Sequence, residues 1–275
     1  MGQTIACANQ KGGVGKTTTV VNLASHLALL GDRVLVIDLD PQGNATSGLG
    51  VDRSTVERST YEALVDGVPL DELVVQGTAE GVDVVPAAIA LAGADLELAG
   101  VMARERRVRR LVEPVAAEYD VIFIDCPPSL GLLTVNALTA ADAVLIPLQC
   151  EYYALEGLTQ LLATIDLVRD HLNPPLKLDG IVLTMYDART NLSADVAAEA
   201  RRHLGSAVYE EVIPRSVRLS EAPSHGLPIT RYAPESRGGI AYGRLAHEFR
   251  MRSGREPVLA VHNDVEARDA AMVMS

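Results

Sequence analysis

The fold is decided by Lys11-Gly12-Gly13-Val14-Gly15-Lys16-Thr17-Thr18. This stretch lies between an apolar run at residues 4–8 and an amphipathic run at residues 20–30, which is the order of a strand, a glycine-rich loop and a helix. Such a loop directs backbone N–H groups at a phosphate chain, and the N-terminus of the following helix adds a favourable dipole. The stretch therefore predicts a nucleotide-binding loop, in which Lys16 reaches the β- and γ-phosphates and Thr17 binds Mg²⁺.

The loop departs from the usual G-x-x-x-x-G-K-[ST] pattern. Gln10 stands where the pattern has its first glycine, and Lys11 adds a second lysine. A lysine at this position is poorly placed for the phosphates that Lys16 serves. We therefore expect Lys11 either to serve a nucleotide held by a second subunit or to be a solvated loop residue.

Composition limits the class of protein. The 275 residues suffice for one α/β domain with a full core. No secretion signal is expected, and no apolar run reaches the roughly 18–20 residues needed to span a bilayer. The cysteines, Cys7, Cys126 and Cys150, lack metal-ligand spacing and are expected to be buried thiols in a reducing cytoplasm.

The charge is unevenly distributed. The net charge is −12, yet residues 201–255 hold ten Arg and five Glu, so this region carries +5 and the remainder −17. A basic region on an acidic protein is able to form a local phosphate-binding face. The alternative is that its arginines pair with glutamates or cover helix surfaces.

Strand-like and helix-like runs alternate along the chain. Apolar runs predict strands at residues 4–8, 34–37, 82–85, 121–124, 143–147, 180–184 and 208–213. Helical patterns lie at residues 18–30, 90–117 (with a possible break), 132–140, 155–171, 193–204 and 239–252. This alternation predicts an α/β fold: a single doubly wound, mostly parallel sheet with helices on both faces, over residues 1–254. Residues 255–275 are expected to be a disordered tail.

Two acidic motifs follow predicted strands. Asp38 and Asp40 precede Pro41, and Asp125 ends the apolar run at 121–124. Carboxylates beside a phosphate-binding loop hold Mg²⁺-bound water or orient the attacking water, and an aspartate at a strand end is the Walker B arrangement. The alternative for Asp38 and Asp40 is a capped turn.

These elements, in this order, resemble the ParA/Soj branch of the deviant Walker ATPases. The resemblance spans residues 1–254 and is closest to the short chromosomal form, which lacks an N-terminal helix-turn-helix extension. It rests on residues 11–18, 36–44, 124–129, 184–193 and 213–224, which read KGGVGKTT, VIDLDPQGN, IDCPPS, TMYDARTNLS and IPRSVRLSEAPS.

The resemblance implies roles at the nucleotide. Lys16 and Thr17 match the phosphate- and Mg²⁺-binding residues. Lys11 matches the signature lysine that contacts nucleotide across a sandwich dimer. Asp40 matches the carboxylate needed for hydrolysis, and Asp125 the Walker B acid that supports Mg²⁺ through water. The rest of the phosphate cradle is matched by Gly12, Gly13, Gly15 and Thr18.

The resemblance also implies contacts with adenine and DNA. Pro214 and Ser216 match the loop that holds adenine. The family often has Asn at position 216; serine is shorter and has no amide, so a side-chain contact with the base is not implied. Arg189 and Arg218 match arginines that bind DNA without reading its sequence.

The function implied is chromosome or plasmid segregation by a cytoplasmic, nucleoid-associated ATPase. An ATP- and Mg²⁺-bound homodimer would bind DNA, and slow hydrolysis stimulated by a ParB-type centromere-binding protein would release it. Independently of the resemblance, Arg215, Arg218, Arg231 and Arg237 fall in predicted loops around the last strand. A dimer would double such phosphate contacts, so nucleotide-dependent dimerisation would switch DNA affinity.

Two alternatives share the nucleotide motifs. A membrane-switching ATPase resembling MinD needs a C-terminal basic amphipathic helix, whereas residues 262–275 are acidic and lack an apolar stripe; no membrane partner is expected. A protein resembling the nitrogenase iron protein needs cysteines that bridge a cluster between subunits. The five arginines at residues 104–110 are expected to be the solvated face of a helix.

Overall fold

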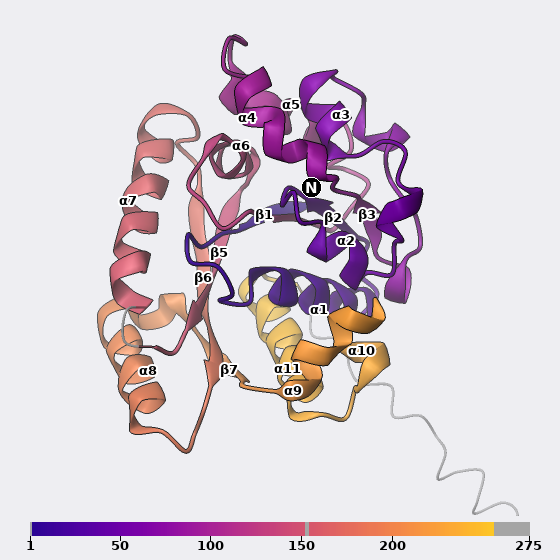
Figure 1. Ribbon diagram of the computed structural model, residues 1–275. Helices are drawn as coiled ribbons and strands as arrows, with labels where there is room; N and C mark the ends of the chain where they lie inside the picture. Colours follow the sequence, from indigo (N-terminus) through magenta and orange to yellow (C-terminus); the bar gives the residue numbers. More distant parts are fainter. Residues whose placement is uncertain (1, 152–153, 256–275) are drawn as a thin grey trace, which may run out of the picture.

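The computed structural model describes residues 2–151 and 154–255. Within these residues, seven strands form one parallel sheet in the order β3-β2-β4-β1-β5-β6-β7 (Figure 1). Their bounds are β1 (Gln3–Cys7), β2 (Val34–Asp38), β3 (Asp83–Val85), β4 (Val121–Asp125), β5 (Ala143–Gln149), β6 (Lys177–Tyr186) and β7 (Val208–Pro214). This confirms the predicted fold class, and each predicted strand lies within two or three residues of an observed one.

The central strands are apolar because both faces of the sheet are covered. Every residue of β2, β4 and β5 is buried, as expected for parallel strands between two helical layers. Side chains alternate between the layers: Ile5 and Cys7 pack on one face, whereas Ala6 and Ala8 pack on the other. The sheet therefore forms the middle of three layers.

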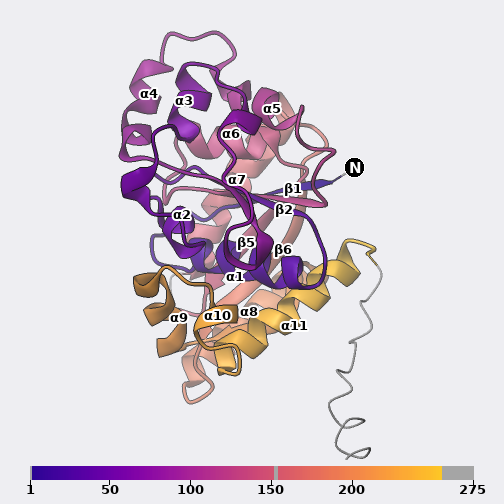
Figure 2. The ribbon, with the colours of Figure 1, turned by 90° about the vertical axis from the view of Figure 1, so that its right-hand side faces the viewer.

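The described residues contain eleven α-helices: α1 (Lys16–Leu29), α2 (Asn44–Gly48), α3 (Thr60–Val65), α4 (Ala94–Glu97), α5 (Arg107–Val112), α6 (Leu132–Ala140), α7 (Ala154–His171), α8 (Asn191–Leu204), α9 (Val217–Glu221), α10 (Ile229–Tyr232) and α11 (Arg237–Arg252). Shorter 3-10 turns are η1 (Arg53–Thr55), η2 (Leu70–Glu72), η3 (Ala79–Gly81), η4 (Ile89–Gly93), η5 (Arg104–Arg106), η6 (Gly205–Ala207) and η7 (Ala222–His225). Helices α1 and α11 cover one face, while α3 and α5–α8 cover the other (Figures 1 and 2).

The helical pattern predicted over residues 90–117, with a possible break, is interrupted more often than expected. The segment is divided among η4, α4, η5 and α5, and Ala103 has a positive φ of 52°, which no right-handed helix accommodates. Leu91 and Leu98 are nonetheless buried in the core. The segment covers the sheet as a series of short turns, so its apolar and alanine-rich composition gave a misleading helical signal.

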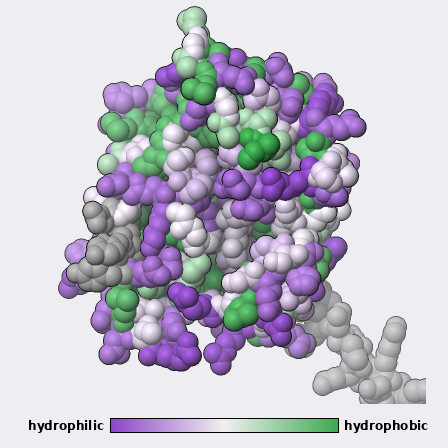
Figure 3. All heavy atoms as spheres, in the orientation of Figure 1, coloured by the Kyte–Doolittle hydropathy of each residue, from purple (hydrophilic) through white to green (hydrophobic). Residues whose placement is uncertain are grey.

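On the face shown in Figure 3, hydrophilic side chains predominate, and apolar surface is most extended in the upper half, around α4 and α6. Leu96 of α4 and Met102 are exposed. Within residues 2–151 and 154–255, no helix has the length and apolarity needed to cross a bilayer. The predicted disordered tail lies, after Arg255, outside the described residues.

Candidate nucleotide-binding site

The topology places the glycine-rich loop at a switch point of the sheet. β1 lies between β4 and β5. Strands β2 to β4 lie on one side of β1 and β5 to β7 on the other, so the strand order reverses at β1. In open parallel sheets, ligands bind in the crevice outside the carboxyl ends of strands at such a point. The loop that follows β1 is therefore flanked by the ends of β4 and β5.

The loop depends on two glycines with left-handed backbones. Gly13 and Gly15 have φ of 73° and 92°, values that side chains with a Cβ rarely adopt. Gly15 precedes the first residue of α1, Lys16. The loop therefore ends by directing the N-terminus of α1, with its free N–H groups, at the crevice.

Buried polar side chains fix the backbone of the loop. Asn9 donates to the Pro147 carbonyl of β5 (2.8 Å) and accepts from the Lys11 N–H (3.0 Å). Thr184 of β6 donates to the Val14 carbonyl (2.8 Å). The loop is thus fastened at both ends to neighbouring strands, which preorganises it for a ligand.

The lysine and threonine at the start of α1 face polar groups inside the crevice. The side chain of Lys16 donates to the Lys11 carbonyl across the loop (3.3 Å). The Thr17 hydroxyl donates to Asp125 Oδ2 (2.7 Å). Asp125 is fully buried, and its other oxygen, Oδ1, has no hydrogen-bond partner among the described residues. Burial, with the neighbouring Asp38 carboxylate, raises the pKa of Asp125 well above its usual range.

Asp38 and Asp40 have different environments although they are two residues apart. Asp38 is fully buried and accepts hydrogen bonds from the Thr46 N–H (2.9 Å), the Thr46 hydroxyl (2.7 Å) and the Asp40 N–H (3.1 Å). Burial raises the pKa of Asp38 to about 6. Asp40 instead lines the cavity, where its Oδ1 accepts from the Gln42 N–H (2.9 Å). Asp38 therefore positions the segment that carries Asp40.

A cavity of about 450 Å³ opens beside the loop. Its lining includes the predicted phosphate-binding and hydrolytic residues Gly12, Gly13, Gly15, Lys16, Thr17, Thr18 and Asp40. A second cavity of about 200 Å³ shares Gly15 and Thr18 with it and is lined by Pro214 and Ser216. The structure thus brings the residues predicted for phosphate and for adenine into two adjoining cavities.

Sequence reasoning missed Met185, which lines both cavities. Its φ of 51° is left-handed, an uncommon conformation for a residue other than glycine. Such outliers are often held in place at binding sites. No sequence signal marks this position, because methionine near a strand end is ordinary in a buried sheet.

Lys11 lines neither cavity. Its ammonium group lies 2.9 Å from Glu151 Oε2, in the segment that follows β5. The opposite oxygen of Glu151 lies 3.9 Å from Arg215 Nη2. Glu151 was not predicted, because its proximity to Lys11 depends on β1 and β5 being neighbours in the sheet.

The predicted DNA-binding arginines follow adjacent strands. Tyr186 of β6 pairs with Pro214 of β7, so Arg189 and Arg218 lie shortly beyond the same edge of the sheet. Both side chains are exposed and ion-paired, Arg189 with Asp187 (2.7 Å) and Arg218 with a neighbouring glutamate (2.9 Å).

The expected loop placement of the arginines is wrong for three of the four. Arg218, Arg231 and Arg237 lie in α9, α10 and α11, and only Arg215 lies in a loop. The helices α9 and α10 escaped prediction because four or five residues show no helical period, whereas α11, predicted over residues 239–252, begins two residues earlier than expected. Several arginines of the basic region pair with carboxylates, including Arg231, which lies 3.2 Å from Glu80.

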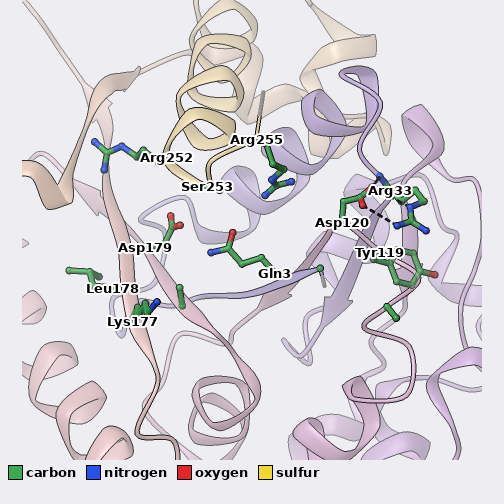
Figure 4. A pocket seen from close by; sticks show the side chains of 13 residues that line it. Gln3, Arg33, Tyr119, Asp120, Lys177, Leu178, Asp179, Arg252, Ser253 and Arg255 are labelled. Atoms are coloured by element: carbon green, nitrogen blue, oxygen red, sulfur yellow. Dashed lines mark hydrogen bonds and ion pairs between the residues drawn. The ribbon is translucent and has the colours of Figure 1, made fainter. Parts of the chain in front are cut away.

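A further cavity of about 660 Å³ lies at the opposite, amino edge of the sheet (Figure 4). At least three of its charged groups have partners among the described residues. Arg33 pairs with Asp120 (3.0 Å), and Asp179 accepts from the buried Tyr209 hydroxyl (2.7 Å). None of the residues predicted for nucleotide or DNA lines this cavity.

The cysteines are buried and free, as predicted. Cys7 and Cys126 are fully buried and Cys150 nearly so, and burial raises the pKa of each thiol. Among the described residues, no group of three or more His, Cys, Asp or Glu side chains is arranged to hold a metal ion.

Comparison with known proteins agrees with this geometry. A family model described as an AAA domain matches residues 2–178. The sporulation initiation inhibitor protein Soj of Bacillus subtilis is 58% identical over 248 residues, which cover 90% of this chain and 98% of that protein. The chromosome partitioning protein ParA of Myxococcus xanthus is 53% identical, with coverage of 92% and 89%.

Solved structures share the fold. A Mycobacterium smegmatis protein named cobyrinic acid a,c-diamide synthase, solved with ADP and magnesium, is 41% identical with a TM-score of 0.80, covering 94% of this chain and 100% of that one. MinD of Pyrococcus horikoshii, complexed with Mg-ADP, is 27% identical with a TM-score of 0.77, covering 92% and 98%. With identity of 58% and 53% to partitioning proteins over 90% and 92% of its length, the chain belongs to the ParA/Soj family of chromosome-partitioning ATPases.

Proposed function

We propose that this protein is an ATP- and Mg²⁺-dependent partitioning ATPase whose ATP-bound dimer binds DNA without sequence preference. The observation that carries the proposal is the cavity lined by Lys16, Thr17 and Asp40 beside the N-terminus of α1. Support for the ligands comes from the M. smegmatis relative with ADP and magnesium and from a second structure of it with an ATP analogue and magnesium.

The residues at the start of α1 fit nucleotide phosphates and Mg²⁺. The N–H groups of the loop and the Lys16 ammonium would hold phosphates. Thr17 would be a direct Mg²⁺ ligand, and Asp125 would act through water. The buried, unpartnered Oδ1 of Asp125 fits this assignment, because a nearby cation would stabilise the ionised carboxylate that burial disfavours. When bound, Mg²⁺ supplies charge neutralisation at the phosphate oxygens.

Hydrolysis is assigned to Asp40 with the two lysines. Asp40 lines the cavity with one oxygen fixed by the Gln42 N–H, an arrangement suited to orienting water toward the terminal phosphate. Lys16 stabilises phosphate charge from its own subunit, and Lys11 does so from the partner subunit. Because that second lysine arrives only in the dimer, turnover and dimerisation are coupled.

DNA binding is assigned to the exposed arginines that follow β6 and β7. The ion pairs of Arg189 and Arg218 are solvent-exposed, and such pairs contribute little and are screened by salt. DNA phosphates are therefore able to displace the carboxylates. One subunit offers few contacts, whereas a dimer doubles them, so ATP-dependent dimerisation raises DNA affinity. A ParB-type protein would stimulate hydrolysis and so release the ATPase from the nucleoid. The protein would be cytoplasmic throughout this cycle.

Charge reversal at Arg218 tests the DNA assignment. We expect Arg218→Glu to abolish DNA retention while leaving ATP-dependent dimerisation intact. The matched control is Arg109→Glu, which reverses an exposed, ion-paired arginine of α5 and should retain DNA binding. Retention and light scattering are measured on the same samples. Loss of dimerisation together with DNA binding, or full DNA binding by Arg218→Glu, would count against the assignment.

A further inference from the structure

We propose that Glu151 is a latch that holds Lys11 within its own subunit and so opposes dimerisation. The inference rests on the proposed function, in which Lys11 serves nucleotide across the dimer. The Lys11 ammonium lies 2.9 Å from Glu151 Oε2. An ammonium group held by a carboxylate must leave it, or share it, before it contacts a phosphate on another subunit. Glu151 therefore competes with the partner's nucleotide for the same cation.

The surroundings confine the movement to the Lys11 side chain. The Lys11 N–H is held by Asn9, itself fastened to β5. Gln10 donates to Gln160 Oε1 of α7 (2.8 Å). Because Asn9 and Gln10 are both anchored, the loop backbone need not change when the ammonium group of Lys11 leaves Glu151. Side-chain rotation alone releases the latch, on the time scale of exposed rotamer changes.

The exposure of the pair makes the latch weak enough to release. Each side chain is 43% exposed, and exposed ion pairs contribute little and are screened by salt. A nucleotide phosphate chain carries more negative charge than one carboxylate. It is therefore expected to displace Glu151 when ATP-bound subunits meet, whereas without such a partner Lys11 remains paired.

Glu151 also retains other partners once Lys11 leaves. Its Oε1 accepts a hydrogen bond from the Gln149 amide and lies 3.9 Å from Arg215 Nη2. Arg215 belongs to the segment that lines the smaller cavity with Pro214 and Ser216. The carboxylate is thus not left unpaired, so release of Lys11 does not leave an isolated charge.

The test compares dimerisation of the full-length wild-type protein with that of Glu151→Gln. Sedimentation equilibrium with Mg²⁺ and a slowly hydrolysed ATP analogue measures the dimer Kd at low and high salt. Glu151→Gln should lower Kd about two- to fivefold at low salt, with a smaller gain at high salt. The control Glu113→Gln removes an exposed carboxylate paired with Arg109 on α5 and should leave Kd unchanged.

The outcomes separate this inference from the function on which it rests. If the wild type dimerises with the analogue but Glu151→Gln has an unchanged or higher Kd, the latch is overturned while the proposed dimer stands. An equal gain in Glu113→Gln also overturns it, because the effect would then be one of net charge. If the wild type stays monomeric at every concentration, the proposed function and the latch both fail.

Discussion

Replacement of Asp38 by asparagine tests the account of the buried carboxylates. Burial raises the pKa of Asp38 from 3.8 to about 6. The folded protein therefore binds more protons than the unfolded chain between these two values. The free energy of unfolding consequently falls as pH rises through this window. Asparagine has no such titration, so the variant should lack this loss.

The magnitude follows from the two pKa values. Because the unfolded chain ionises Asp38 more readily, the raised pKa lowers the free energy of unfolding by about 1.6 kcal/mol at pH 5 and about 3 kcal/mol at pH 8. The free energy of unfolding of Asp38→Asn, relative to that of the wild type, should therefore rise by about 1.4 kcal/mol from pH 5 to pH 8. The charge of Asp38 also raises the pKa of Asp125, so its removal acts in the same direction. A constant cost from lost hydrogen bonds to Thr46 cancels in this difference.

The assay is urea unfolding at pH 5 and pH 8, with EDTA and without nucleotide, so that no cation stabilises the carboxylates. The control is Asp71→Asn, which removes a carboxylate exposed on η2 and should give no comparable difference. A difference near zero for Asp38→Asn, or one of opposite sign, would refute the reasoning. Asp38 would then ionise as readily in the folded protein as in the unfolded chain.

Two further predictions concern the supports of the loop and the sheet. Thr184→Val keeps the side-chain shape but leaves the buried Val14 carbonyl without its 2.8 Å donor. We expect the unfolding free energy to fall by about 1–3 kcal/mol and calorimetry to show weaker nucleotide binding. Unchanged values of both would contradict the role of this contact. Gly180→Ala places a Cβ 2.4 Å from the Tyr209 ring. This clash should lower the unfolding free energy by about 1–3 kcal/mol. An unaltered melting temperature would show that the β6–β7 packing tolerates the methyl group.

Local sequence signals predicted the fold where the pattern was strong. The run at residues 121–124 matches β4, and the helix predicted over residues 132–140 matches α6. The strand β4 is buried on both faces, which explains its continuous apolar run. The pattern of α6 contains no helix breaker, so local preference and tertiary packing agree. Residues 90–117 failed because short turns covering a core contain the same apolar residues as a helix. There, the chain turns at Ala103, where φ is positive, while Leu98 stays buried in the core.

The candidate site was predicted where one contiguous motif carries the chemistry. Lys16 and Thr17 lie at the cavity because the loop and α1 form a single local unit. Glu151 and Met185 were missed because their positions follow from strand order, which the alternation of strands and helices leaves open. The ion pair of Arg231 with Glu80 likewise required knowledge of which segments meet in space.

The central claim is that ATP switches this protein onto DNA. The most direct measurement is fluorescence anisotropy of a labelled random-sequence duplex with no nucleotide, with ADP, and with a slowly hydrolysed ATP analogue, each with Mg²⁺ and at two salt concentrations. The account predicts binding only with the ATP analogue, and weaker binding at the higher salt concentration. Absence of binding in all three states, or equal binding in all three, would contradict it.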